Sequence, residues 1–263
     1  MGILVVKRLI AIILVLSIPL QAAAPPAGKC DQGGFAATTN ASCALSGMVL
    51  GQLIACVIFV QSTTITISSF SDGGTGQTWH TIGPVIGSNN ETFIIWAIDT
   101  GSTFATTGVV LSANGTGDTF CAEYSNMASV GTVADCNSAG SSGNSTSLTS
   151  GSCTPSAAND VILGGGGSMA NSITYTAGGS FTIEAQDAHS TQGNSAGWED
   201  ENSASCSSQA ATMTASGSAA QWSMIMAAFK TNSPTSCSSP PQGGVIFLKG
   251  GSTKMEGGTV KIK

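Results

Sequence analysis

The chain has 263 residues, of which only 8% are charged, and its eight Lys and Arg against 14 Asp and Glu give a net charge of −6. No Lys or Arg occurs between Lys29 and Lys230. Proteins that bind nucleic acids or anionic lipids use these cationic side chains to neutralise phosphates, so the composition excludes both kinds of partner for this long segment.

The first 24 residues have the pattern of a secretory signal peptide. Lys7 and Arg8 precede an apolar run over 9–20, and residues 22–24 are small, as at a cleavage site. The run is shorter than the ~20 residues that a membrane-spanning helix needs. We therefore expect a secreted or cell-surface protein, bacterial in origin, with no transmembrane anchor after cleavage. An uncleaved anchor is the alternative, because residues 1–6 are also apolar.

After an N-terminal segment over 25–41, the chain consists of short runs typical of β-strands. Residues 52–61 are continuously apolar, as in a strand buried on both faces, whereas 64–70 alternate and place Ile65 and Ile67 on one face. Roughly ten to twelve such strands separated by turn residues indicate an all-β fold, an antiparallel β-sandwich that is jelly-roll-like, over 42–232. The other predicted strands cover 42–47, 79–85, 91–99, 108–113, 119–125, 160–166, 180–186, 211–216 and 221–230.

Eight cysteines follow the predicted signal peptide. An even number in an exported chain predicts disulfide bonds, although the sequence leaves their pairing open. A zinc site is disfavoured because the cysteines lack the close spacing of zinc ligands and both histidines, His80 and His189, are isolated. The disulfide candidates are Cys30, Cys43, Cys56, Cys121, Cys136, Cys153, Cys206 and Cys237.

A Pro- and Ser-rich linker over 233–242 precedes a repeat over 243–263. Gly-Gly pairs begin at 243, 250 and 257, a period of seven residues, which predicts a small C-terminal β-meander with two-residue turns. Four of the lysines lie in this tail, where they could protect its edges from pairing. The alternative is that the tail docks onto an acidic neighbour or supplies a strand to another subunit, so that the protein self-associates.

Several stretches together resemble a family of secreted bacterial β-sandwich domains of largely unknown function. They include SDGGTGQTWHTI, FIIWAID, CAEYSNM, SCTPSAANDVILGGGG and WEDE, and the resemblance covers about 42–230. It implies an exported, jelly-roll-like sandwich used in cell-surface or adhesive contexts, and it supplies no active site. Gln77 stands where the family commonly has Asn, and the cysteines are additions to the family pattern.

Two tryptophans are candidates for a ligand-binding platform. Glycan recognition uses exposed aromatic rings beside polar groups, and Trp79 and Trp198 each follow a polar turn. Trp96 and Trp222 lie within apolar strands and are predicted core residues. The alternative for Trp79 and Trp198 is that they close the ends of the sandwich.

The stretch Glu199-Asp200-Glu201 is the densest group of charges in the chain. Calcium takes carboxylate, amide and carbonyl oxygens, so a structural calcium ion held by these three residues and Asp72 is a candidate cofactor. The alternatives are that Asp72 caps its own turn and that residues 198–201 form the solvated start of a strand.

Catalytic chemistry is disfavoured. Neither residues 199–201 nor Glu184 with Asp187 form a recognisable glycosidase pair, which needs two carboxyl groups across a cleft. The GNSAG stretch around Ser195 matches a nucleophile elbow only as a string, since no helix pattern or later histidine follows. Residues 164–167 are four glycines without the following Lys of a phosphate loop.

The sequence therefore predicts a secreted, disulfide-bonded, non-catalytic surface or extracellular binding module for a glycan or another cell-surface component. The second hypothesis is a structural protein that polymerises or attaches through its β tail or an edge strand. The third is a glycoside hydrolase or lyase.

Overall fold

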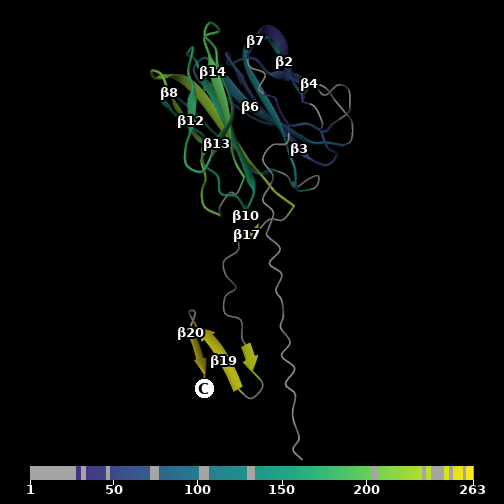
Figure 1. Ribbon diagram of the computed structural model, residues 1–263, viewed down its shortest axis with the longest axis vertical. Coiled ribbons are helices and arrows are strands. Elements are labelled where there is room, and N and C mark those ends of the chain that lie inside the picture. The colour runs from purple at the N-terminus through teal and green to yellow at the C-terminus, as the bar shows by residue number, and fades with distance from the viewer. Residues whose placement is uncertain are drawn as a thin grey trace, which may run out of the picture.

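The structure, a computed structural model, describes residues 28–30, 34–45, 48–71, 77–100, 107–128, 134–202, 206–232, 235–237, 246–248, 251–256 and 259–262. Among these residues every regular element is a β-strand, and all pairings are antiparallel (Figure 1). None of the described segments is an apolar helix that could cross a membrane. The predicted all-β antiparallel sandwich is confirmed, while the predicted signal peptide lies outside the described residues.

The first sheet contains the strands from the N-terminal half of the chain. Its order is β1-β7-β3-β6-β5, and β2 and β4 also pair with β7. Its strands are β1 (Gly28–Cys30), β2 (Phe35–Cys43), β3 (Leu53–Val60), β4 (Ile67–Ser71), β5 (His80–Ile86), β6 (Glu91–Ile98) and β7 (Thr107–Tyr124).

The second and third sheets come from the C-terminal half. The second has the order β13-β14-β11-β16-β8 and the third the order β12-β15-β9, while β10 (Ala157–Ala158) pairs with β17 (Thr235–Ser236). The remaining strands of these sheets are β8 (Ala134–Ser145), β9 (Ser147–Thr149), β11 (Val161–Ser168), β12 (Tyr175–Ala177), β13 (Thr182–Ala188), β14 (Ser195–Glu201), β15 (Thr212–Ala215) and β16 (Ala220–Phe229).

Strand β7 joins two parts of the first sheet. Near its start, Val109 lies opposite both Ala41 of β2 and Phe70 of β4, whereas near its end Cys121 lies opposite Cys56 of β3. The sequence predicts two strands here, over 108–113 and 119–125, because the turn-type residues 114–118 separate the two apolar runs; in the structure all of these positions belong to one 18-residue strand.

Three apolar clusters hold the layers together. One, which includes Val57, Phe59 and Trp198, lies between the first and second sheets. Another covers the opposite face of the first sheet beneath β2 and β4, and the third lies between the second and third sheets. Strands β3, β6, β11 and β16 are therefore covered on both faces, which is why their apolar runs are continuous rather than alternating.

The four glycines at 164–167 let the layers approach closely. They lie in the buried strand β11, with Gly164 and Gly165 facing opposite sides. A Cβ atom on Gly165 would lie 2.5 Å from a methyl group of Val57 in the first sheet, and one on Gly164 would overlap Cβ of Ala211. These glycines are thus a packing feature rather than a ligand loop.

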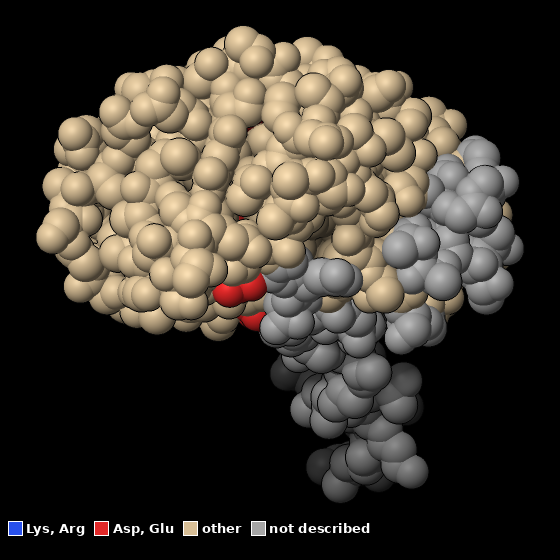
Figure 2. Space-filling view, turned by 90° about the horizontal axis from the view of Figure 1, so that it is seen from above, with Lys and Arg blue, Asp and Glu red and all other residues tan. Residues whose placement is uncertain are grey.

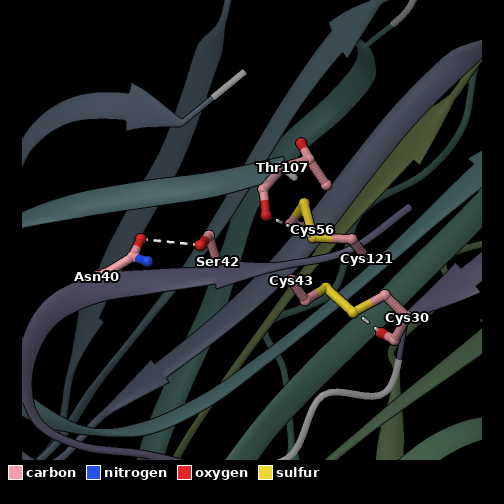
Figure 3. Close-up of a disulfide and its surroundings, with 7 residues drawn as sticks. All are labelled: Cys30, Asn40, Ser42, Cys43, Cys56, Thr107 and Cys121. Carbon is pink, nitrogen blue, oxygen red and sulfur yellow. Dashed lines mark hydrogen bonds between the residues drawn. A yellow bond between two sulfur atoms is a disulfide. The ribbon is translucent and has the colours of Figure 1, made fainter. Parts of the chain in front are cut away.

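All eight predicted disulfide cysteines are paired. The pairs are Cys30–Cys43, Cys56–Cys121, Cys136–Cys153 and Cys206–Cys237. Figure 3 shows the first two beside each other, where they tie β1 to β2 and β3 to β7 within the same apolar cluster. Four disulfides indicate that the protein folds in an oxidising, extracellular environment.

The sandwich extends beyond its predicted boundaries. The segment 25–41, predicted to precede the sandwich, contributes β1 and part of β2, and the start of the predicted linker supplies β17 and the disulfide to Cys206. In the tail, β18 (Ile246–Leu248), β19 (Gly251–Glu256) and β20 (Thr259–Ile262) form the predicted meander. Its first hairpin pairs Leu248 with Gly251, so that turn is one residue earlier than predicted. Self-association through residues 243–263 stays a prediction.

Candidate functional site

Most of the acidic side chains that the structure describes are buried. The face shown in Figure 2 accordingly displays very little charge beyond a small acidic patch at its edge. The surface is instead built largely from uncharged residues, so a charge-based binding surface is not evident on this face. Glu91, Asp99, Asp118, Glu123, Asp160, Glu199, Asp200 and Glu201 are each at most 7% exposed.

The acidic run at 199–201 lies in the interior, so the interpretation of a solvated strand start is wrong. Strand β14 is paired on both sides, with β11 and with β13. Neighbouring residues of a strand point to opposite faces: Glu199 faces the third sheet near Ala211, and Asp200 accepts a hydrogen bond of 2.7 Å from the Tyr124 hydroxyl. Burial raises the pKa of Glu199 to about 8.

The candidate calcium site is divided by this geometry. Glu199 and Glu201 lie on one face of β14 and Asp200 on the other, so these carboxyl groups do not converge. Asp72 lies outside the described residues. A calcium ion that includes Asp72 therefore stays a prediction, and it could use only one of the two faces of β14.

The two candidate platform tryptophans differ in position. Trp198 is 1% exposed and packs edge-on against Tyr124 at 6.4 Å between ring centres, so the prediction that it presents a ring to a ligand is wrong. Trp79 is half-buried and stacks on Phe70 at 5.8 Å. Trp96 and Trp222 are buried core residues, as predicted.

The serine of the GNSAG stretch has a structural role. Ser195 begins β14 and is fully buried, and its hydroxyl donates a hydrogen bond to the Ala170 carbonyl and accepts one from the Ile173 amide. These contacts hold the turn between β11 and β12. The string match to a nucleophile elbow is therefore a coincidence of composition.

A polar cluster that the sequence did not suggest connects β7 with the end of β13. His189 Nε2 lies 2.7 Å from Oδ1 of the buried Asp118 and 3.6 Å from Oδ2 of Asp187. The Asn194 amide donates to Asp118 at 2.5 Å, and the Gln61 amide donates to Asn194 at 2.6 Å. Asp118 and His189 are 71 residues apart, and no local pattern marks either of them.

Hydrogen bonds among its own residues explain the arrangement of this polar cluster without a metal ion. Its nitrogen and oxygen donors lie within 4.8 Å of one another, a set that divalent metals accept. The Gly34 N–H also lies 3.2 Å from His189 Nε2, which accepts this hydrogen bond when it carries no proton and donates to Asp118 when it carries one. Burial raises the pKa of Asp118 to about 6, and the contact with His189 opposes this rise. The cluster thus fastens the N-terminal segment to both sheets.

Removing the imidazole should expose the cost of burying Asp118. We expect His189→Gln to lower the free energy of unfolding by about 2–3 kcal/mol at pH 8, because the buried Asp118 carboxylate loses His189 and keeps only Asn194 as a partner. The loss should shrink below about pH 6, where Asp118 holds a proton. Urea denaturation at both pH values measures it. Adding Asp118→Asn should recover part of the loss; a double variant as unstable as the sum of the single variants would contradict this explanation.

A pocket of about 340 Å³ opens beside the first sheet. One wall is the connection from β3 to β4, the other is β5, and the floor is the start of β6. A bulge at Gly83, where φ is +96°, interrupts the pairing of β5 with β6 between Ile82 and Val85. The lining residues are Thr63, Thr64, Ile65, Thr66, Ile67, Thr81, Gly83, Pro84, Ile86, Glu91 and Phe93.

Glu91 gives this pocket its chemistry. It is 2% exposed, and its Oε1 atom has no hydrogen-bond partner among the described residues. Burial raises the pKa of Glu91 to about 7, while the Ile65 N–H partly opposes the shift by binding the carboxyl group. A mostly apolar pocket with one perturbed polar group is the usual form of a small-ligand site. No pattern in the sequence marks this pocket, because its residues come from three separate segments.

Comparison with protein-family models, curated proteins and solved structures finds no match to this chain.

Proposed function

We propose that this chain is a secreted, non-catalytic binding protein that recognises a saccharide in the pocket around Glu91. The observation that carries the proposal is the lining itself, in which four threonines stand beside apolar residues that include Phe93. Hydroxyl groups can exchange hydrogen bonds with sugar hydroxyls, and apolar groups can pack against the C–H faces of the ring. The size falls at the lower end of the range for small-ligand pockets.

The pocket favours binding over catalysis. Glu91 is the one ionisable side chain among its described lining residues, whereas glycoside hydrolysis generally needs two carboxyl groups on either side of the bond. The lining also contains no Lys or Arg to stabilise an enolate or an anionic sugar. These features support the binding hypothesis over a hydrolase or a lyase.

Filling the pocket provides the test. We expect glucose, N-acetylglucosamine and glucosamine to bind with dissociation constants of about 1 mM or lower, and glucuronic acid not to bind, as measured by isothermal titration calorimetry. Thr81→Trp should abolish binding, because Thr81 is an exposed residue on the pocket wall. Thr176→Trp, at an exposed position on β12 outside the pocket, is the matched control. Binding that survives Thr81→Trp, or no binding of any sugar, would overturn the proposal.

A further inference from the structure

The identity of the sugar can be narrowed from the surroundings of Glu91, provided that the proposed saccharide site is correct. Glu91 begins β6, and the backbone of the β3–β4 connection supplies its one hydrogen-bond donor, the Ile65 N–H. Oε1 has no hydrogen-bond partner among the described residues, and Glu91 is only 2% exposed, so water does not replace the missing partner. A buried acceptor without a donor is costly, so a ligand that supplies a donor to Oε1 gains affinity. Because Oε1 has almost no accessible surface, such binding requires the Glu91 carboxyl group to turn toward the pocket.

The charge around the pocket restricts that donor. The lining holds no basic side chain, and the sequence has no Lys or Arg between Lys29 and Lys230. An anionic sugar would therefore meet Glu91 without any compensating cation. A neutral hydroxyl group would donate one hydrogen bond to Glu91. An ammonium group would donate a hydrogen bond and would also carry the positive charge that the pocket lining lacks. Hydrogen bonds between charged partners are stronger than those between neutral partners.

The threonines suit the same ligand group. An ammonium group has three donors and no acceptor, and Thr63, Thr64, Thr66 and Thr81 of the pocket lining carry hydroxyl oxygens that can serve as further acceptors. We propose that the pocket selects an amino sugar with a free amine, whose ammonium group binds Glu91 while its ring packs on the apolar floor.

The test compares sugars that differ at one substituent. At pH 7 we expect glucosamine to bind at least about tenfold more tightly than glucose and N-acetylglucosamine, in keeping with a charge-assisted hydrogen bond. Glu91→Gln should remove this preference. Calorimetry in buffers of different ionisation enthalpy should also detect a proton released on glucosamine binding, since the ammonium group drives Glu91 to its charged form.

The outcomes separate the two proposals. Equal affinity for the three sugars, lost in Thr81→Trp, would overturn the amine preference and leave saccharide binding in place. A glucosamine preference that persists in Glu91→Gln would also overturn the assignment to Glu91. If none of the three sugars binds, both proposals fail.

Discussion

Replacing Glu199 with glutamine should stabilise the folded protein at alkaline pH and leave it almost unchanged near pH 4. Burial raises the pKa of Glu199 from 4.5 to about 8, so the folded protein holds this proton over a range in which the unfolded chain has lost it. In that range the unfolded state binds fewer protons, and stability falls as the pH rises. Glutamine has a similar shape and cannot ionise, so the variant avoids this loss.

The expected difference is large. A shift of one pKa unit corresponds to 1.36 kcal/mol, so we expect Glu199→Gln to exceed the wild type by roughly 4 kcal/mol at pH 9. Guanidinium denaturation from pH 4 to 9, with the disulfides intact, measures the difference. Glu91→Gln is the matched control, and its benefit should be complete by about pH 7 because the pKa of Glu91 is raised only to about 7. A wild-type protein equally stable at pH 5 and pH 9 would contradict the prediction.

Moving one methyl group across the interface between the second and third sheets should reveal how tightly these layers pack. In Gly164→Ala the new Cβ would overlap Cβ of Ala211, and we expect the free energy of unfolding to fall by about 3 kcal/mol from overpacking. Ala211→Gly alone should cost about 1 kcal/mol through its void and added chain freedom. The double variant has the same atoms, with the methyl group on the other side of the interface. Its loss of unfolding free energy should therefore be clearly smaller than the sum of the losses in the two single variants.

The control for this double-mutant cycle is Gly165, the next residue of the same strand. Gly165→Ala would contact Val57 in the first sheet instead, at 2.5 Å, so Ala211→Gly should not rescue it. Urea unfolding of the variants gives the interaction energy, which we expect to exceed about 1 kcal/mol for the Gly164 pair and to be near zero for the Gly165 pair. Additive losses at Gly164 would show that the layers separate easily.

Local patterns predicted the strands well where both faces are covered by apolar groups. The continuous apolar run at 52–61 became β3, and the predicted strand at 221–230 became β16. Strand β8 was missed because its Ser, Gly and Asn residues show no apolar alternation; it is held by backbone pairing to β16. The even number of cysteines predicted disulfides, but only the register of the strands could decide their pairing, as with Cys56 directly opposite Cys121.

The candidate sites depended far more on tertiary structure. Scarcity of charge drew attention to residues 199–201, and the structure shows that these acids are buried rather than gathered at the surface. The pocket unites Ile65, Thr81 and Glu91, and the polar cluster unites Asp118 with His189, although no spacing in the sequence relates these residues. The sequence by itself determined a disulfide-bonded β-sandwich poor in cations, because apolar periodicity, cysteine number and composition are local or additive properties. Only the stacking of the sheets decided which carboxyl groups are buried away from water and which of them lines a pocket. The reason is that desolvation depends on neighbours that are distant along the chain.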